Sequence, residues 1–238
     1  MLPDDVHLQI GSLLYEGIDQ IDLTGPFEVL SRLPNSTYRI YGATIAPVRD
    51  ILGLRLMADA LLAEAPQLDL LHVPGGPGQE ALMEDEEVLE WLRRQAAGAR
   101  CVFSVCTGAL LLGAAGLLKG RRATTFWNAM YLLPYFGAAP VDERVVMDGS
   151  WVFTAGVTAG LDGALRVAAE LRGDKVAQSI QLGMAYDPEP PFQSGRPETA
   201  PPDVLAESVR SGQALSDRRL ATARRVAARL EIPLPSEG

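Results

Sequence analysis

Short apolar runs alternate with helical patterns along this chain of 238 residues, and this order constrains the fold more than any other feature. The runs lack strict alternation of polar and apolar residues, which is typical of strands buried on both faces of a parallel sheet. Because parallel strands need crossover connections, the order predicts a flavodoxin-like α/β fold, a mostly parallel sheet with helices on both faces. The predicted strands are Leu8–Tyr15, Tyr38–Thr44, Leu68–Val73, Cys101–Val105 and Trp151–Thr154.

The segments between these strands predict helices. Thr24 and Gly25 precede Pro26, and because proline favours the first helical turn, the first helix is predicted at Pro26–Leu33. A short hairpin is predicted at Ile51–Met57, with Gly53 at its turn. The other predicted helices are Glu86–Ala97, Thr107–Leu118 with its end at Lys119-Gly120, Ala159–Leu171 and Lys175–Tyr186.

A proline-rich segment interrupts this order after Tyr186. Residues 187–203 contain six prolines, which predicts an irregular loop that runs over the surface or wraps a partner. Residues 204–230 then alternate Ala, Val and Leu with Arg, as in one or two amphipathic helices. We therefore expect an α/β domain over residues 1–187, with residues 188–238 as a loop and helical tail of the same domain.

Cys106 lies where the strand Cys101–Val105 ends and the helix Thr107–Leu118 is predicted to begin. Ser104 and Gly108 flank it two residues away on either side, which is the spacing of a nucleophile elbow. Such a turn places the thiol at the carboxyl edge of the sheet, where open α/β sheets bind ligands, and next to a helix N-terminus that favours thiolate. The alternative is that Cys106 is a small buried residue that caps the strand.

A glycine-rich loop, residues 73–78 with the sequence VPGGPG, follows another predicted strand. Consecutive glycines let the backbone approach a ligand closely, so the N–H of Gly75 or Gly76 could stabilise developing negative charge. The spacing matches neither a dinucleotide fingerprint nor a Walker loop. An ordinary tight turn is the alternative.

Asp22 is the third candidate, because it lies among apolar neighbours on a predicted loop at the end of the first strand. There its carboxylate could serve as an acid or base beside Cys106. The alternative is a turn residue or helix N-cap, which aspartate also favours.

Composition excludes several classes of protein. Acidic side chains outnumber basic ones by 30 to 21, and a net charge of −9 disfavours a nucleic-acid partner. Two cysteines are too few for a disulfide framework or a four-ligand zinc site. Cys101 is expected to be a core residue, and both thiols are expected to be free. No signal-peptide pattern and no apolar run of roughly 18 residues occurs, so we expect a cytoplasmic protein without a membrane partner.

The chain resembles the ThiJ/PfpI superfamily, which has the class I glutamine-amidotransferase-like fold, and within it the isocyanide hydratases. The similarity extends through the proline-rich loop into the helical tail. The matching segments are Asp22–Pro26, Pro74–Gly76, Ala81–Asp85, Ser104–Gly108, Gly113–Leu118, Gly120–Thr125, Glu143–Val146 and Thr158–Gly160.

This resemblance implies an enzyme that hydrates an isocyanide, R–N≡C, to an N-substituted formamide. Cys106 would be the nucleophile, Asp22 the general acid/base and Thr107 an active-site partner, with a Gly76 N–H near the sulfur. The resemblance also implies a small-molecule isocyanide substrate, a homodimer, and no metal or organic cofactor.

One position departs from the family pattern. Phe126 stands where related sequences usually have histidine, and the two histidines, His7 and His72, are expected to be structural. A Cys–His dyad therefore lacks its histidine, which disfavours protease, amidotransferase and glyoxalase-like activities. A non-enzymatic sensor that uses Cys106 is the main alternative to the hydratase.

Overall fold

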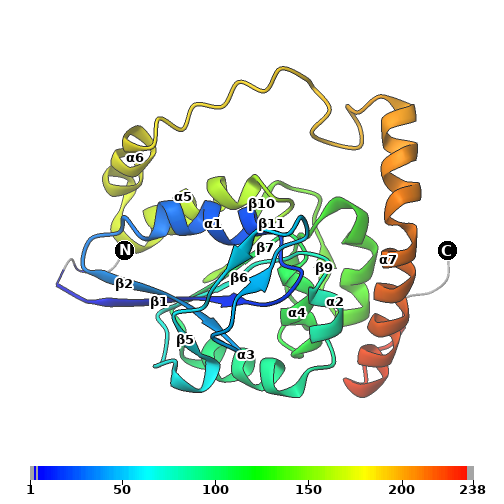
Figure 1. Ribbon diagram of the computed structural model, residues 1–238, viewed down its shortest axis with the longest axis horizontal. Coiled ribbons are helices and arrows are strands. Elements are labelled where there is room, and N and C mark those ends of the chain that lie inside the picture. Colours follow the sequence, from blue (N-terminus) through cyan, green and yellow to red (C-terminus); the bar gives the residue numbers. More distant parts are fainter. Residues whose placement is uncertain (1–2, 4, 235–238) are drawn as a thin grey trace.

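The computed structural model describes residue 3 and residues 5–234. Its centre is a seven-stranded sheet in which every neighbouring pair is parallel except the edge pair β10–β11 (Figure 1). This confirms the predicted mostly parallel sheet. In spatial order the strands are β10 (Val145–Asp148), β11 (Trp151–Thr154), β7 (Cys101–Val105), β6 (Leu70–Val73), β1 (Leu8–Leu14), β2 (Ser36–Gly42) and β5 (Ala60–Leu61).

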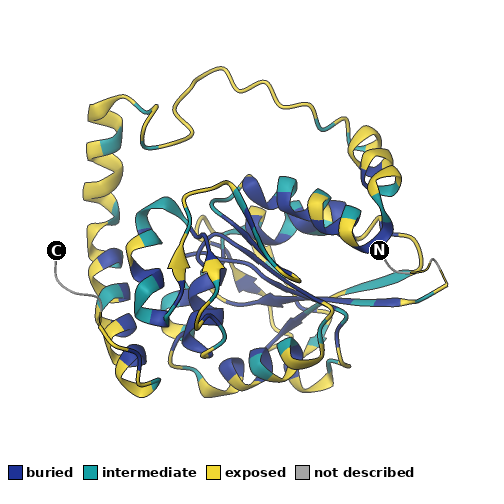
Figure 2. Ribbon diagram, turned by 180° about the vertical axis from the view of Figure 1, so that it is seen from behind, coloured by how far each residue is buried: buried dark blue, intermediate teal, exposed yellow. Residues whose placement is uncertain are grey.

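Helices cover both faces of the sheet, as the strand pattern predicts (Figures 1 and 2). Each face buries its own apolar cluster, so the core has two layers. One face carries α1 (Gln20–Leu30), α5 (Ala159–Arg172) and α6 (Asp174–Gly183). The other carries α2 (Gln79–Leu82), α3 (Glu86–Gly98), α4 (Gly108–Ala114) and the 3₁₀ segment η2 (Trp127–Phe136).

Several short elements complete the fold. The predicted hairpin is present, formed by β3 (Val48–Arg49) and β4 (Arg55–Leu56), with Gly53 in its turn. The edge strand β10 and the segment η2 have no counterpart in the predicted elements. The remaining short elements are η1 (Leu62–Glu64), β8 (Arg122–Ala123) and β9 (Ala139–Pro140).

The first helix begins at Gln20, so the predicted start at Pro26 was wrong. Asp19 caps the helix instead, because its carboxylate accepts the Ile21 N–H at 3.2 Å. Pro26 lies in the helix interior, where its missing N–H leaves the Asp22 carbonyl without its usual helical donor. Asp22 is therefore held in the first turn of a helix and not on a loop.

Helix α4 ends at Ala114, four residues before the predicted end at Leu118. The guanidinium of Arg229, from the C-terminal helix, donates to the Ala114 carbonyl at 2.7 Å and occupies that helix end. The predicted cap at Lys119-Gly120 was therefore also wrong.

The proline-rich segment forms neither helix nor strand, and it arches from α6 to the C-terminal helix α7 (Pro202–Arg229) (Figure 1). The tail is one helix of 28 residues. Its first half is exposed, whereas its second half packs against η2 and α2 (Figure 2). The side chains that α7 buries are Ser216, Arg219, Thr222, Ala223, Val226 and Ala227.

None of the helices in the described part of the chain has the length and apolar character needed to cross a bilayer.

Candidate functional site

The carboxyl ends of three neighbouring strands define the site. Strand β7 pairs with β6 on one side and with β11 on the other, and all three run in the same direction. Val73, the last residue of β6, pairs with Ser104, so the chain leaves β6 at Pro74 next to the point where it leaves β7 at Cys106. The glycine loop and the cysteine turn therefore meet at one edge of the sheet, the carboxyl edge predicted for Cys106.

Cys106 has the backbone of a nucleophile elbow. Its φ is +54°, in the left-handed region that a residue with a side chain rarely adopts. Its N–H donates to Thr154 O at 3.0 Å, and its carbonyl accepts from Thr125 Oγ1 at 2.7 Å, which holds this conformation in place. A Cβ on Gly108 would lie 2.0 Å from the Val73 carbonyl oxygen, so the small residue predicted there is required.

The glycine loop is joined by hydrogen bonds to two other candidate site residues, Asp22 and Thr107. Gly75 N–H donates to Asp22 Oδ2 at 3.0 Å, and Gly76 N–H donates to Thr107 Oγ1 at 3.1 Å. A Cβ on Gly75 would lie 2.5 Å from Thr107 N, so only glycine allows this approach. Both amides thus hold side chains of the site in place, and an oxyanion at either one would have to compete with these bonds.

Asp22 is fully buried in the first turn of α1. Within the described residues its Oδ1 has no hydrogen-bond partner. Burial raises the pKa of Asp22 to about 8, with a further contribution from the negative charge of Asp19. The Gly75 N–H and the nearby Cys106 thiol act in the opposite direction. Asp22 therefore carries a proton at neutral pH.

The Cys106 thiol is 6 % exposed, and burial raises its pKa well above the usual value, with the charge of Asp22 as the next cause. The Thr107 N–H at the start of α4 and the Arg219 guanidinium lower it. The helix N-terminus therefore favours the thiolate, as expected, but burial has the larger effect on the pKa. The resting thiol keeps its proton. Since Asp22 and Cys106 influence each other, their protons come off as a coupled pair.

Arg219 was not found by sequence reasoning. It comes from α7 and is 6 % exposed, and its Nη2 lies 3.4 Å from Thr107 Oγ1 and 3.3 Å from Gly76 O. The only sequence signal for it is a charged residue on the helix face that also carries Ala223 and Val226.

The two histidines lie in structural positions, as expected. His7 is exposed and bonds Asn35 and Thr37, whereas His72 is buried in β6 with its Nδ1 2.5 Å from Ser12 Oγ. Burial lowers the pKa of His72 to about 3, so its ring stays neutral. Phe126 is half-buried and packs against the apolar cluster that contains Cys106, so no imidazole occupies that position.

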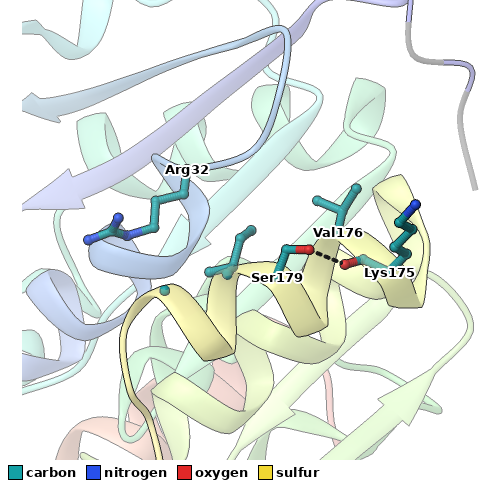
Figure 3. Close-up of a pocket in the computed structure, with 6 residues that line it drawn as sticks. Arg32, Lys175, Val176 and Ser179 are labelled. Carbon is teal, nitrogen blue, oxygen red and sulfur yellow. Dashed lines mark hydrogen bonds between the residues drawn. The ribbon is translucent and has the colours of Figure 1, made fainter.

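The cavities described for this chain lie away from Cys106. A surface cavity of about 350 Å³ lies between α6 and the end of α1, and Arg32, Lys175, Val176 and Ser179 line it (Figure 3). A cavity of about 100 Å³ lies between Trp127, the proline-rich loop and the start of α7.

Both cysteines are free and buried, and burial raises the pKa of Cys101 to about 12. Cys101 is therefore a core residue, as predicted. Over the described residues, no three His, Cys, Asp or Glu side chains gather where they could hold a metal ion.

Comparisons with known proteins find similarity over most of the chain. The sequence model of the DJ-1/PfpI family matches residues 9–170. The isonitrile hydratase of Pseudomonas putida is 47% identical over 225 residues, which cover 94% of this chain and 99% of that protein.

Solved structures show the same similarity. A ThiJ/PfpI family protein from Pseudomonas syringae is 38% identical, with a TM-score of 0.89 over 92% of this chain and 91% of the other. DJ-1beta of Drosophila melanogaster, at 23% identity and a TM-score of 0.70, shares the fold over 76% of this chain and 98% of its own.

Proposed function

Since this chain belongs to the DJ-1/PfpI family, we propose that it is an isocyanide hydratase, a lyase that converts R–N≡C and water to an N-substituted formamide. The observation that carries the proposal is the 47% identity to an isonitrile hydratase over 99% of that protein's length. The geometry around Cys106 supports it, because a thiol, a protonated carboxyl and an N–H donor meet at one turn. The substrate is a small molecule, and the active residues are Cys106, Asp22 and Thr107.

In the first step, the Cys106 thiol gives its proton to solvent, and the resulting thiolate forms a bond to the terminal carbon of the isocyanide. One π pair of the C≡N bond moves to nitrogen, and the carbon lone pair takes the proton that Asp22 holds. The product is a thioimidate, R–N=CH–S–Cys106, and Asp22 becomes a carboxylate. A raised pKa suits Asp22 to this role, because it keeps the acid protonated near neutral pH.

In the second step, Asp22 takes a proton from water while the water oxygen attacks the thioimidate carbon and the displaced π pair moves to nitrogen. The tetrahedral intermediate collapses as its hydroxyl proton passes to nitrogen and its oxygen becomes C=O. The C–S bond breaks, the formamide leaves, and the Cys106 thiolate takes a proton from solvent. Of the two water protons, one returns Asp22 to its acid form and the other ends on nitrogen.

Isotope labelling tests this chemistry. We expect the purified protein to convert an alkyl or aryl isocyanide to its formamide with one ¹⁸O from H₂¹⁸O and, in D₂O, one deuterium on the formyl carbon. Mass spectrometry and NMR of the product measure both labels, and a Cys101→Ser variant should give the same result. If no isocyanide in a varied panel is consumed, the proposed function is wrong.

The protein is also proposed to be a cytoplasmic homodimer. Two free buried thiols suit a reducing compartment. Exposed apolar side chains support self-association, since an interface between two copies would bury them. They are Ile51, Leu52, Leu54 and Met57 in and beside the β3–β4 hairpin, Leu182 on α6, Phe192 in the proline-rich loop, and Val204 and Val209 on α7.

Light scattering across a concentration series should therefore give a mass of about twice 25.5 kDa. The reason is that burial of exposed apolar side chains in an interface stabilises the dimer. A mass of one chain at every concentration would contradict the dimer.

A non-enzymatic sensor is less well supported. Sensor cysteines are accessible and have a low pKa, whereas Cys106 is buried with a raised pKa. The tail forms a single helix in place of a helix-turn-helix.

A further inference from the structure

One face of α7 makes a row of polar contacts with the short helix α2 and the glycine loop before it. Thr222 Oγ1 donates to Glu80 Oε1 at 2.6 Å, and Arg225 donates to both oxygens of Glu84 at 2.9 and 2.7 Å. Arg219 lies one turn before Thr222 on the same face. The row therefore aligns Arg219 with the start of α2, where the glycine loop enters the site.

The Arg219 guanidinium is held by neutral oxygens. Its Nε donates to Gln79 Oε1 at 2.8 Å, and its Nη2 donates to Gly76 O at 3.3 Å and to Thr107 Oγ1 at 3.4 Å. A buried cation with neutral partners is costly unless a negative charge lies nearby. Burial lowers the pKa of Arg219, whereas Cys106, Tyr15, Tyr131 and Glu80 raise it.

Among the residues that the structure describes, the charged groups around Cys106 are two carboxyl groups and one cation, Arg219. Two carboxyl groups of α1 lie near the thiol, Asp22 in its first turn and Asp19 at its N-cap, and both raise the pKa of Cys106. Tyr15, at the end of β1, donates to Pro74 O at 3.0 Å, and burial raises its pKa well above the usual value. Arg219 is the one cation among the described groups that lower the pKa of Cys106.

We propose that Arg219 is a positioning residue of this active site, which α7 inserts to hold Thr107 and the glycine loop and to stabilise the Cys106 thiolate. The family match ends at residue 170, so α7 lies outside it. Thr107 and Arg219 are 112 residues apart in sequence. The proposal rests on the proposed function only for the identity of the substrate. The effect of Arg219 on the thiolate can be measured with any electrophile that reacts with Cys106.

Alkylation of Cys106 by iodoacetamide, without isocyanide, tests the assignment. Mass mapping of the Cys106 peptide gives the alkylation rate against pH for wild type, Arg219→Met and Arg219→Lys. A nearby positive charge lowers a thiol pKa by about one unit or more, so Arg219→Met should slow alkylation at pH 7 by about tenfold or more. Arg219→Lys keeps the charge and should recover part of the rate.

Arg218→Met is the matched control, because it removes the exposed arginine next to Arg219 on the same helix. It should leave the alkylation profile unchanged. Gln79→Glu is a second, isosteric test, since a carboxylate 2.8 Å from Nε would neutralise Arg219. It should shift the profile to higher pH, as Arg219→Met does.

If Arg219→Met fails to fold, which circular dichroism would show, the Gln79→Glu profile decides the question. An unchanged profile in whichever of these two variants folds would overturn the assignment. Isocyanide turnover is measured in parallel, because shifted alkylation profiles with no turnover in the wild type would refute the hydratase function and leave the role of Arg219 intact.

Discussion

Replacing Cys106 by serine should lower kcat/KM for isocyanide hydration by at least about 10⁴-fold. A serine hydroxyl at this buried position is far harder to ionise than a thiol, and no imidazole stands beside it to act as a base. Product formation measured by chromatography, with enzyme concentrations high enough to detect slow turnover, gives the ratio.

Cys101→Ser is the control, since Cys101 is equally buried but lies at the start of β7, away from the site. Its turnover should stay close to that of the wild type. Intact-mass spectrometry of wild type quenched during turnover should show an adduct of one isocyanide mass on Cys106. Substantial turnover in Cys106→Ser would exclude the thioimidate route.

Replacing Asp22 by asparagine should lower kcat by about 10²–10⁴-fold, because the reaction loses the proton donor to carbon and the base for water. Asp19→Asn is the matched control. It removes a carboxylate three residues away while keeping an N-cap of similar quality, so its effect on kcat should be far smaller. Equal losses in the two variants would show that Asp22 acts only through the charge of this region.

The same Asp22→Asn substitution should stabilise the fold near neutral pH. The pKa of Asp22 is about 8 in the folded chain, against an ordinary value of 3.8. Below about pH 4 the carboxyl is protonated in both states, so the variant and the wild type should be equally stable with respect to this group. Between pH 4 and 8 only the folded chain binds the proton, so wild-type stability falls as the pH rises.

We therefore expect the Tm of Asp22→Asn to exceed that of wild type by about 5 °C at pH 7.5 and by little at pH 4. Calorimetry across this range measures the difference. A difference that does not change with pH would mean that the pKa of Asp22 is not raised.

The fold was largely predictable because its strands are continuous apolar runs. Cys101–Val105 and Trp151–Thr154 were predicted with the bounds that the structure has. The edge strand β10 was missed because Val145–Asp148 is half-exposed and carries little of that signal. The start of α1 was misplaced because Pro26 resembles a first-turn proline, whereas Asp19 supplies the cap.

The cysteine turn follows from residue spacing, and sequence alone predicts it. Its meeting with the glycine loop depends on β6 lying beside β7 in the sheet, which the sequence only allows. The hydrogen bonds that occupy the Gly75 and Gly76 amides depend on where side chains from α1 and α4 arrive, which local patterns do not encode. Arg219 could not be predicted from the sequence for the same reason. On an amphipathic helix, an arginine is normally solvated, and only the docking of α7 turns this one inward.

The position of α7 after the strands of the sheet in the sequence gives the protein an order of assembly. Domains begin to fold during synthesis, and every strand of the central sheet, the last of which ends at Thr154, leaves the ribosome before Arg219 does. Until α7 docks, Cys106 lies beside Asp22 without the Arg219 guanidinium, which lowers the pKa of the thiol. If Arg219 has the role proposed above, a chain without a docked α7 therefore holds the Cys106 proton more firmly than the complete fold does.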